Sequence, residues 1–210
     1  FFRNVGLLAL VAGGFHFRFY IQKAQGTRYK YNDNWPDKHR RFLFDSQTHD
    51  NIFWSIASGC TIWSAYEIVT YWLFANGHIA FLNWVDHPVY FVLLYFAVNP
   101  LRTIHFYLTH RLLHWKPLYK AAHYLHHKNV NIGPWSGLSM HPIEHLIYFT
   151  GVLFHWVLLS HPMHAIFHLQ HAAFTAPYGH TGFEHLVLKK DCKIPNSSDY
   201  FHYLHHRYFE

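Results

Sequence analysis

The chain has 210 residues, of which 20% are aromatic and only 13% are charged, about half the charged share of a soluble domain. That composition argues against an ordinary soluble protein. The net charge of +6 does not indicate a nucleic-acid-binding protein, because the basic residues lie in groups beside apolar segments. No low-complexity linker divides the sequence, so residues 1–210 are predicted to form a single membrane-embedded domain.

The first apolar segments predict helices. Residues 5–21 lack a compact apolar core followed by a cleavage site, so they indicate a shortened first membrane helix rather than a removable signal peptide. Residues 51–77 and 86–109 are predicted to form a helical hairpin. Glu67, inside the first arm, is expected either at a helix end or paired with Arg102. Helix should continue over residues 105–128, with a break near Pro117.

An uncharged run follows. Between Glu144 and Glu184 there is no Asp, Glu, Lys or Arg, a stretch long enough to cross a bilayer twice, with a turn at Ser160–Pro162. Residues 178–198 are predicted as a loop and 199–207 as a final helix, and strand signals are weak because hydrophobic alternation is absent. The predicted fold is therefore all-α: an integral membrane helical bundle of about four transmembrane helices with a cytoplasmic, histidine-rich metal-binding cap.

The basic residues predict the orientation of this bundle. They fall in three groups that flank the apolar segments: Lys23, Arg28, Lys30, Lys38, Arg40 and Arg41; Arg111, Lys116, Lys120 and Lys128; and Lys189, Lys190 and Lys193. Basic groups beside membrane segments mark the cytoplasmic side. Two crossings between residues 51 and 109, and two more between 142 and 177, would keep all three groups on that side.

The two cysteines and the chain start carry smaller predictions. Cys60 and Cys192 are far apart in unlike contexts, so we expect two unpaired thiols in a reducing compartment. The chain begins with Phe1 rather than Met, so the natural N-terminus is expected upstream.

Histidine carries the chemical signal, with 23 residues of this type. His-x-x-His-His occurs twice, and a His-x-x-x-His pair precedes the first copy. The members of these clusters are His110, His114, His123, His126, His127, His202, His205 and His206. Spacings of three and four place side chains on one helix face, so each cluster can aim two or three imidazoles at one point.

Eight imidazoles suit two metal ions with open positions better than one saturated ion, and imidazole binds iron, copper, zinc and nickel. Soluble di-iron bundles use Glu and Glu-x-x-His instead. Here most acidic residues lie in polar loops, so any site for two metals must be dominated by histidine.

These ordered clusters resemble the fatty acid hydroxylase and sterol desaturase superfamily, over about residues 105–207. The resemblance implies an integral membrane enzyme with a histidine-bound di-iron centre facing the cytoplasm, in the endoplasmic reticulum of a eukaryote or the inner membrane of a bacterium. It implies O2-dependent hydroxylation or desaturation of a lipid. Zinc can replace iron during purification. Members usually continue beyond the last cluster, so a C-terminal tail is expected. No haem, flavin or iron–sulfur motif occurs, so the electron donor should be a separate cytochrome- or ferredoxin-type protein.

Further candidates follow from segments near the clusters. By resemblance, His180 in Gly179–Gly182 is a ninth ligand and His141 a weaker candidate. His145 is a similar candidate, and helix capping or a headgroup contact would explain both histidines equally well. Glu184 is a candidate to orient a ligand histidine.

Two further sets of residues, in or near the membrane segments, have less specific expected roles. The histidines of the uncharged run are expected to hydrogen-bond to the site from outside; they are His155, His161, His164, His168 and His171. Aromatic residues of the membrane helices are expected to pack helices, form an interfacial belt or shape a substrate channel; they are Trp63, Tyr66, Tyr71, Trp72, Phe91 and Tyr95.

Alternative functions remain at this stage. A membrane metal transporter or metal-binding protein would use the same histidines, although a transporter should spread its ligands through the bilayer. A related scaffold could instead cleave ether lipids or process aldehydes. Sterol, sphingoid base, fatty acyl chain and carotenoid all remain open as substrates, as does hydroxylation against desaturation.

Overall fold

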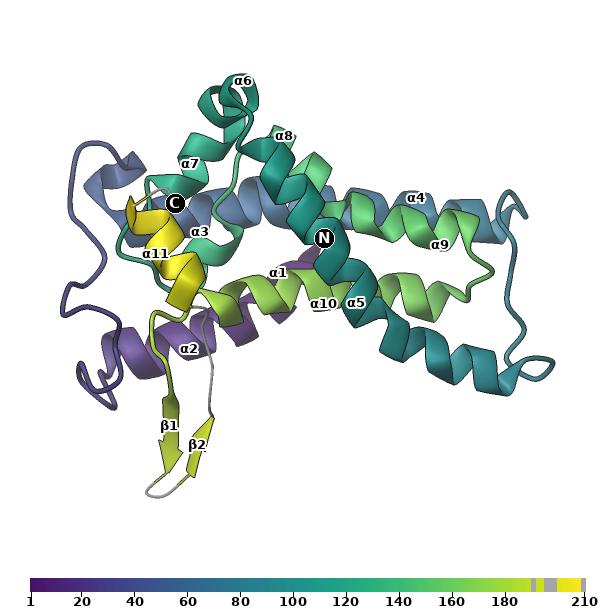
Figure 1. The fold of residues 1–210 in the computed structure, drawn as a ribbon, viewed down its shortest axis with the longest axis horizontal. Coiled ribbons are helices and arrows are strands. Elements are labelled where there is room, and N and C mark those ends of the chain that lie inside the picture. The colour runs from purple at the N-terminus through teal and green to yellow at the C-terminus, as the bar shows by residue number, and fades with distance from the viewer. Residues whose placement is uncertain (190–191, 195–199, 209–210) are drawn as a thin grey trace.

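The structure is a computed structural model that describes residues 1–189, 192–194 and 200–208, and this part is mostly helical (Figure 1). The first helix runs without a break from Phe2 to Ile21. It comprises α1 (Phe2–Leu8), α2 (Gly14–His16) and two wider π-type segments, Ala9–Gly13 and Phe17–Ile21. It ends where Lys23 adopts a positive φ of 50°. The predicted first helix is therefore confirmed.

Both helices of the predicted first hairpin are present. α3 (Gln47–Trp54) continues through Ser55–Cys60 into α4 (Thr61–Ala75), and the chain turns at Gly77, whose φ is +69°. α5 (Pro88–Leu113) runs back and packs mainly against α10 (Pro162–Gly179) rather than α4. It begins at Pro88, where the missing N–H costs no helical hydrogen bond. A short 3₁₀ turn, Leu43–Asp45, precedes α3.

The helix after α5 breaks two residues earlier than Pro117. Trp115 is extended, with ψ 126°, and helix resumes through α6 (Lys116–Leu118), Tyr119–His123 and α7 (Tyr124–His127). Pro117 thereby occupies the first turn of the new helix, where its missing N–H is tolerated. This break lets α7 turn away from α5, so the first two histidine clusters lie on separate helices.

The uncharged run forms the predicted second hairpin. Its first arm is α8 (Pro142–Tyr148), Phe149–Leu153 and α9 (Phe154–Val157), and its second is α10 (Pro162–Gly179). Two histidines start these arms. The Nδ1 atoms of His141 and His161 accept hydrogen bonds from the backbone N–H groups of Ile143 and Met163, each at 3.2 Å. A 3₁₀ segment, Pro134–Leu138, precedes α8.

The region predicted as a loop after α10 contains a small β-hairpin, which corrects the prediction of a loop there, while the described chain stays almost entirely helical. β1 (Leu186–Lys189) pairs antiparallel with β2 (Cys192–Ile194), and Leu186 lies opposite Ile194. The strands are too short for a period-two pattern to stand out. α11 (Tyr200–Tyr208) then carries the last histidine cluster.

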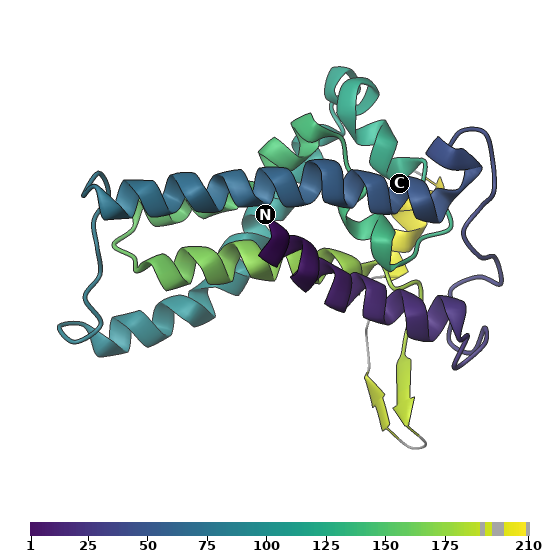
Figure 2. The same ribbon diagram turned by 180° about the vertical axis from the view of Figure 1, so that it is seen from behind.

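Long helices extend to one end of the molecule, and the helices that carry the two His-x-x-His-His motifs lie toward the other (Figures 1 and 2). α4, α5, α9 and α10 reach the end closed by loop 76–87, whereas α3, α7 and α11 lie at the opposite end. Segments 22–45 and 115–128, which carry basic residues, also lie toward that second end. Of the third basic group, Lys190 lies outside the described residues, as do the side chains of Lys189 and Lys193.

Two helices of the described chain are long and apolar enough to cross a membrane, Phe2–Ile21 and Pro88–Leu113. Only 11% of the apolar window of the second is buried, so it is not the core helix of a soluble domain. The predicted count of four crossings stays a prediction. Both cysteines are free, with Cys60 buried and Cys192 exposed.

Glu67 does not pair with Arg102. Its buried carboxylate in α4 accepts hydrogen bonds from Arg3 and from Asn4, the latter at 3.0 Å. The first helix therefore supplies the partner of Glu67. The local sequence does not show that this helix packs against α4. Arg102 is left without this counter-charge.

Candidate metal centre

Nine histidines converge in two adjacent groups. Within each group, one nitrogen from every imidazole lies within 4.8 Å of all the others. The first group contains His110, His114, His123, His127 and His205, and the second contains His126, His180, His202 and His206. These are the nine histidines that the sequence predicts as ligands, and the structure brings all of them together.

Each His-x-x-His-His motif is divided between the two groups. In the first motif, His123 and His127 belong to the first group and His126 to the second; in the last motif, His202 and His206 belong to the second group and His205 to the first. Residues four apart share a helix face, whereas adjacent residues point about 100° apart. Each motif therefore serves two points, not the single point that spacing alone suggests.

The two groups lie side by side. The rings of His127 and His206, one from each group, stack with centroids 4.7 Å apart, and those of His126 and His127 lie 5.9 Å apart. Two ions held in these groups would be near neighbours. The two groups could thus hold two metal ions close together.

Tight backbone packing positions the ligand at the end of α10. A Cβ on Gly137 would lie 2.3 Å from the carbonyl oxygen of Ala176, so only glycine allows segment Pro134–Leu138 to approach α10 this closely. His180 follows one turn after Ala176, and its Nδ1 donates to that same carbonyl at 2.8 Å. The contact therefore fixes the position and ring orientation of His180.

The hydrogen bonding of His180 turns a ring nitrogen toward the other histidines of the second group. Because a carbonyl only accepts, the Nδ1 of His180 carries the proton and its Nε2 presents a lone pair. That Nε2 lies 3.1 Å from Nε2 of His202 and 3.3 Å from Nε2 of His206. With the protons of His202 and His206 also on Nδ1, three lone pairs would point at one position, which a metal ion would occupy. The residues present thus fit a metal ion.

The spacing of the nitrogens gives the same result. Neighbouring nitrogens around an ion with metal–nitrogen bonds of about 2.0–2.1 Å are separated by roughly 2.9–3.4 Å in octahedral or tetrahedral geometry. In the first group, Nε2 of His114 lies 2.8 Å from that of His205 and 3.2 Å from that of His123, and His123 to His127 is 3.1 Å. These distances match one coordination shell.

Burial keeps the imidazoles in the neutral form that binds metal. Burial, followed by the charges of neighbouring histidines, lowers the pKa of His127 to about 2 and that of His114 to about 4. The same causes hold the pKa values of His126 and His206 well below the usual 6.5. A proton therefore competes poorly for these nitrogens at neutral pH.

Glu144 is a site residue that the sequence analysis did not single out. Its Oε1 lies 2.8 Å from Nδ1 of His123, and both side chains are buried. Burial disfavours an isolated charge on either partner. A cation at Nε2 would favour the arrangement in which Nδ1–H donates to an ionised carboxylate. The signal available in the sequence was an acid at the edge of an uncharged run, in the His141-Pro-Ile-Glu144 segment.

Three weaker candidates lie outside both groups. His141 caps α8, as its alternative interpretation predicts. His145 is buried, but its Nδ1 contacts Ser58 Oγ at 2.8 Å. Glu184 is exposed and lies 4.0 Å from His185, so its predicted contact with a ligand histidine is not formed. Glu144 occupies that place instead.

The histidines of the uncharged run form their own contacts. His155 lies 3.1 Å from His168 through ring nitrogens and 3.0 Å from Ser160 Oγ, and His164 donates to the carbonyl of Phe91. Within the described part of the chain, none of these hydrogen bonds reaches a histidine of the two groups. The expectation that they hydrogen-bond to the site from outside is therefore wrong for His155, His164 and His168.

A cavity of about 130 Å³ borders the histidines. His110, His126, His180 and His202 line it together with Glu144, and its other walls include Arg102, Phe106, Met140 and Tyr148. None of the six aromatic residues predicted to shape a channel lines this cavity; Trp63, for example, is fully buried in the core. The cavity instead uses residues of α5, α8 and α10 that become neighbours only in the folded bundle.

The ordered histidine clusters and the helical bundle agree with a match to a known family. The profile described as fatty acid hydroxylase matches residues 92–210, more than half of the chain. The chain belongs to the fatty acid hydroxylase family. The resemblance seen in the sequence is thereby confirmed. No solved structure matches the chain.

Relatives of known name are sterol desaturases. The chain is 33% identical over 89 residues to the Delta(7)-sterol 5(6)-desaturase of Candida glabrata, covering 42% of this chain and 24% of that protein. It is 29% identical over 98 residues to the Saccharomyces cerevisiae enzyme of that name, covering 45% and 26%. For the Delta(7)-sterol-C5(6)-desaturase of Nicotiana tabacum the values are 27% over 168 residues, 78% and 59%. The chain thus spans about a quarter to three fifths of these relatives.

Proposed function

We propose that this protein is an O2-dependent lipid desaturase or hydroxylase that holds two iron ions in the two histidine groups. The observation that carries the proposal is the convergence of nine imidazoles, in a member of the fatty acid hydroxylase family, beside a cavity. Iron bound there would supply the two-electron activation of dioxygen that removal of hydrogen from an unactivated C–H bond requires.

The protein's own residues have distinct tasks in this function. The first group of histidines, with Glu144 behind His123, would hold one ion, and the second group, with the Ala176 carbonyl behind His180, would hold the other. Phe106, Met140 and Tyr148 give the cavity apolar surface that excludes stray water and admits a hydrocarbon. A carbon placed in the cavity would lie next to ligands of both groups.

A membrane sterol is the preferred substrate class, because the relatives above are named as sterol desaturases. Placement of a second C–H bond within reach gives desaturation, and its absence gives hydroxylation, so the cavity shape decides the outcome. Sphingoid bases and fatty acyl chains are the next candidates, since the family is described by fatty acid hydroxylation.

Localisation and electron supply complete the proposal. We infer that the chain is an integral membrane protein of about four crossings with its metal site on the cytoplasmic side, because basic segments lie toward the histidine-bearing end. In a eukaryote this is the endoplasmic reticulum, and in a bacterium the inner membrane. A separate cytochrome- or ferredoxin-type protein would donate electrons there.

Metal stoichiometry tests the proposal first. The protein is purified in detergent without chelators or immobilised-metal chromatography, and its iron content and substrate-dependent O2 consumption are measured with an electron donor. About two irons per chain with O2 uptake on adding a sterol support it. One metal or none, without O2 uptake but with metal flux in vesicles, would indicate the transporter. If zinc is found, the assay is repeated after reconstitution with iron.

A further inference from the structure

Arg102 lies in the middle of α5 and lines the cavity beside the histidines. Within the described residues, no carboxylate lies within ion-pair distance of it, since Glu67 pairs with Arg3 and Glu144 contacts His123. An arginine in an apolar helix without a counter-charge is energetically costly and is a signature of function. The cavity has room for a ligand that could serve as the partner of Arg102.

The contacts of Arg102 leave part of its guanidinium unused. Nη2 donates to the hydroxyl of Tyr148 at 3.2 Å, and that hydroxyl donates to the carbonyl of Ala172 at 2.8 Å. The guanidinium carbon lies 4.9 Å from the ring centre of Phe106. The Nε atom is buried and makes no hydrogen bond to any described residue. A buried donor in this state costs free energy that a ligand oxygen would recover.

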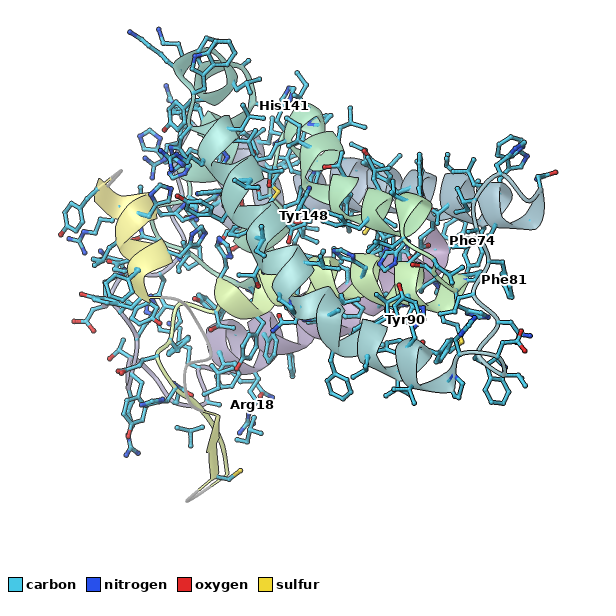
Figure 3. All side chains as sticks on the ribbon, turned by 45° about the vertical axis from the view of Figure 1, so that its right-hand side comes forward. Arg18, Phe74, Phe81, Tyr90, His141 and Tyr148 are labelled. Atoms are coloured by element: carbon cyan, nitrogen blue, oxygen red, sulfur yellow. The ribbon has the colours of Figure 1, made fainter. Side chains whose placement is uncertain are left out.

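The neighbouring side chains hold Arg102 in place. Phe106 is one turn further along α5 and Tyr148 closes α8, so a cation–π contact and a hydrogen bond fix the guanidinium from two elements. Figure 3 shows Tyr148 beside the middle of α5, whereas Arg18 lies away from it on the first helix. The guanidinium of Arg102 is therefore pre-organised, which reduces the entropy lost when it binds an acceptor.

We propose that Arg102, supported by Tyr148, binds an oxygen atom of the lipid substrate, either a hydroxyl or a carboxylate. This inference rests on the proposed function and narrows its substrate class to oxygen-bearing lipids. An oxygen acceptor on the lipid would use the N–H donors of the guanidinium, whereas a pure hydrocarbon would leave Nε buried and unpaired.

The placement also sets a distance along the substrate. Arg102, Phe106 and His110 line the cavity at intervals of four residues, so they lie on one face of α5. Arg102 precedes His110 by two turns, about 12 Å along the helix axis. The guanidinium lies over Phe106, so the arginine side chain spans part of this distance toward His110. Binding of the oxygen by Arg102 would thus select which carbon is presented to the metal site.

Matched probes with and without oxygen test this inference. Equilibrium binding to the purified protein is measured without an electron donor, so that no turnover occurs. One pair of probes is cholest-7-en-3β-ol and cholest-7-ene, and the other is stearic acid and octadecane. We expect one oxygenated probe to bind about 10- to 100-fold more tightly than its hydrocarbon, as a hydrogen bond to a charged donor allows. The pair that shows the preference identifies hydroxyl or carboxylate.

Variants locate the effect. Arg102→Met should remove the preference without changing affinity for the hydrocarbon, and Arg102→Lys should keep part of it. Arg18→Met, which removes a partly exposed arginine that donates to the Leu188 carbonyl, is the matched control and should bind like the wild type. If Arg102→Met does not fold, Tyr148→Phe should reduce the preference about 2- to 5-fold, as loss of one neutral partner does.

The results separate this inference from the proposed function. Equal binding of both members in both pairs, or an unchanged preference in Arg102→Met, overturns the role of Arg102. A preference that depends on Arg102 in a protein that never consumes O2 supports the binding site while refuting the oxygenase.

Discussion

Replacement of Glu144 by Gln should weaken one metal site and spare the other. Oε1 of Glu144 contacts His123 Nδ1 at 2.8 Å, and the two side chains are 2% and 0% exposed, so water cannot substitute for the lost charge. A hydrogen bond to a charged group contributes about 1.5–3 kcal/mol, which corresponds to roughly 10- to 150-fold in affinity. Loss of such partners behind metal-binding histidines typically costs about 10- to 100-fold.

Site selectivity is the decisive part of this prediction. His123 belongs to the first group only, so titration of metal-free protein with Co²⁺, followed by visible absorption, should show one tight phase unchanged and one shifted. Glu184→Gln is the matched control, because Glu184 is an exposed acid outside both groups. Equal weakening of both phases, or no shift in either, would refute the assignment of Glu144 to His123.

Three further predictions follow from the site. His126→Ala and His205→Ala should each lower metal content from about two to about one per chain and abolish turnover while membrane insertion is retained. Normal activity in both variants would contradict the assignment of these histidines as metal ligands. Gly137→Ala should cost about 1–3 kcal/mol by steric strain and weaken the second metal site, whereas Gly14→Ala, with open space around it, should not, as thermal unfolding with metal analysis would show. The pKa of His127 is about 2 when folded and about 6.5 when unfolded, so the unfolded chain binds more protons between these values. The free energy of unfolding of the metal-free protein should therefore fall by about 1 kcal/mol per pH unit below 6.5 from this residue. An unfolding temperature that does not fall from pH 7.5 to 5.5 would contradict this.

Local sequence determined the elements and the kind of chemistry. The long apolar segments and the uncharged run allow their backbone groups to be satisfied only within helices, and the turns at Gly77 and at Ser160–Pro162 follow from residues that end or begin helices. Histidine spacings of three and four fixed which imidazoles share a helix face. Nine ligand candidates and the family could therefore be read from the sequence.

Tertiary packing decided how those imidazoles are used. The division of each His-x-x-His-His motif between two groups depends on how α7 and α11 face each other, and helix period alone does not contain that angle. Glu144 reaches His123, and Arg3 rather than Arg102 reaches Glu67, through contacts between segments distant in the chain. A charge takes the partner that the fold brings near, so the sequence could supply the acid and the bases while only the folded bundle could pair them.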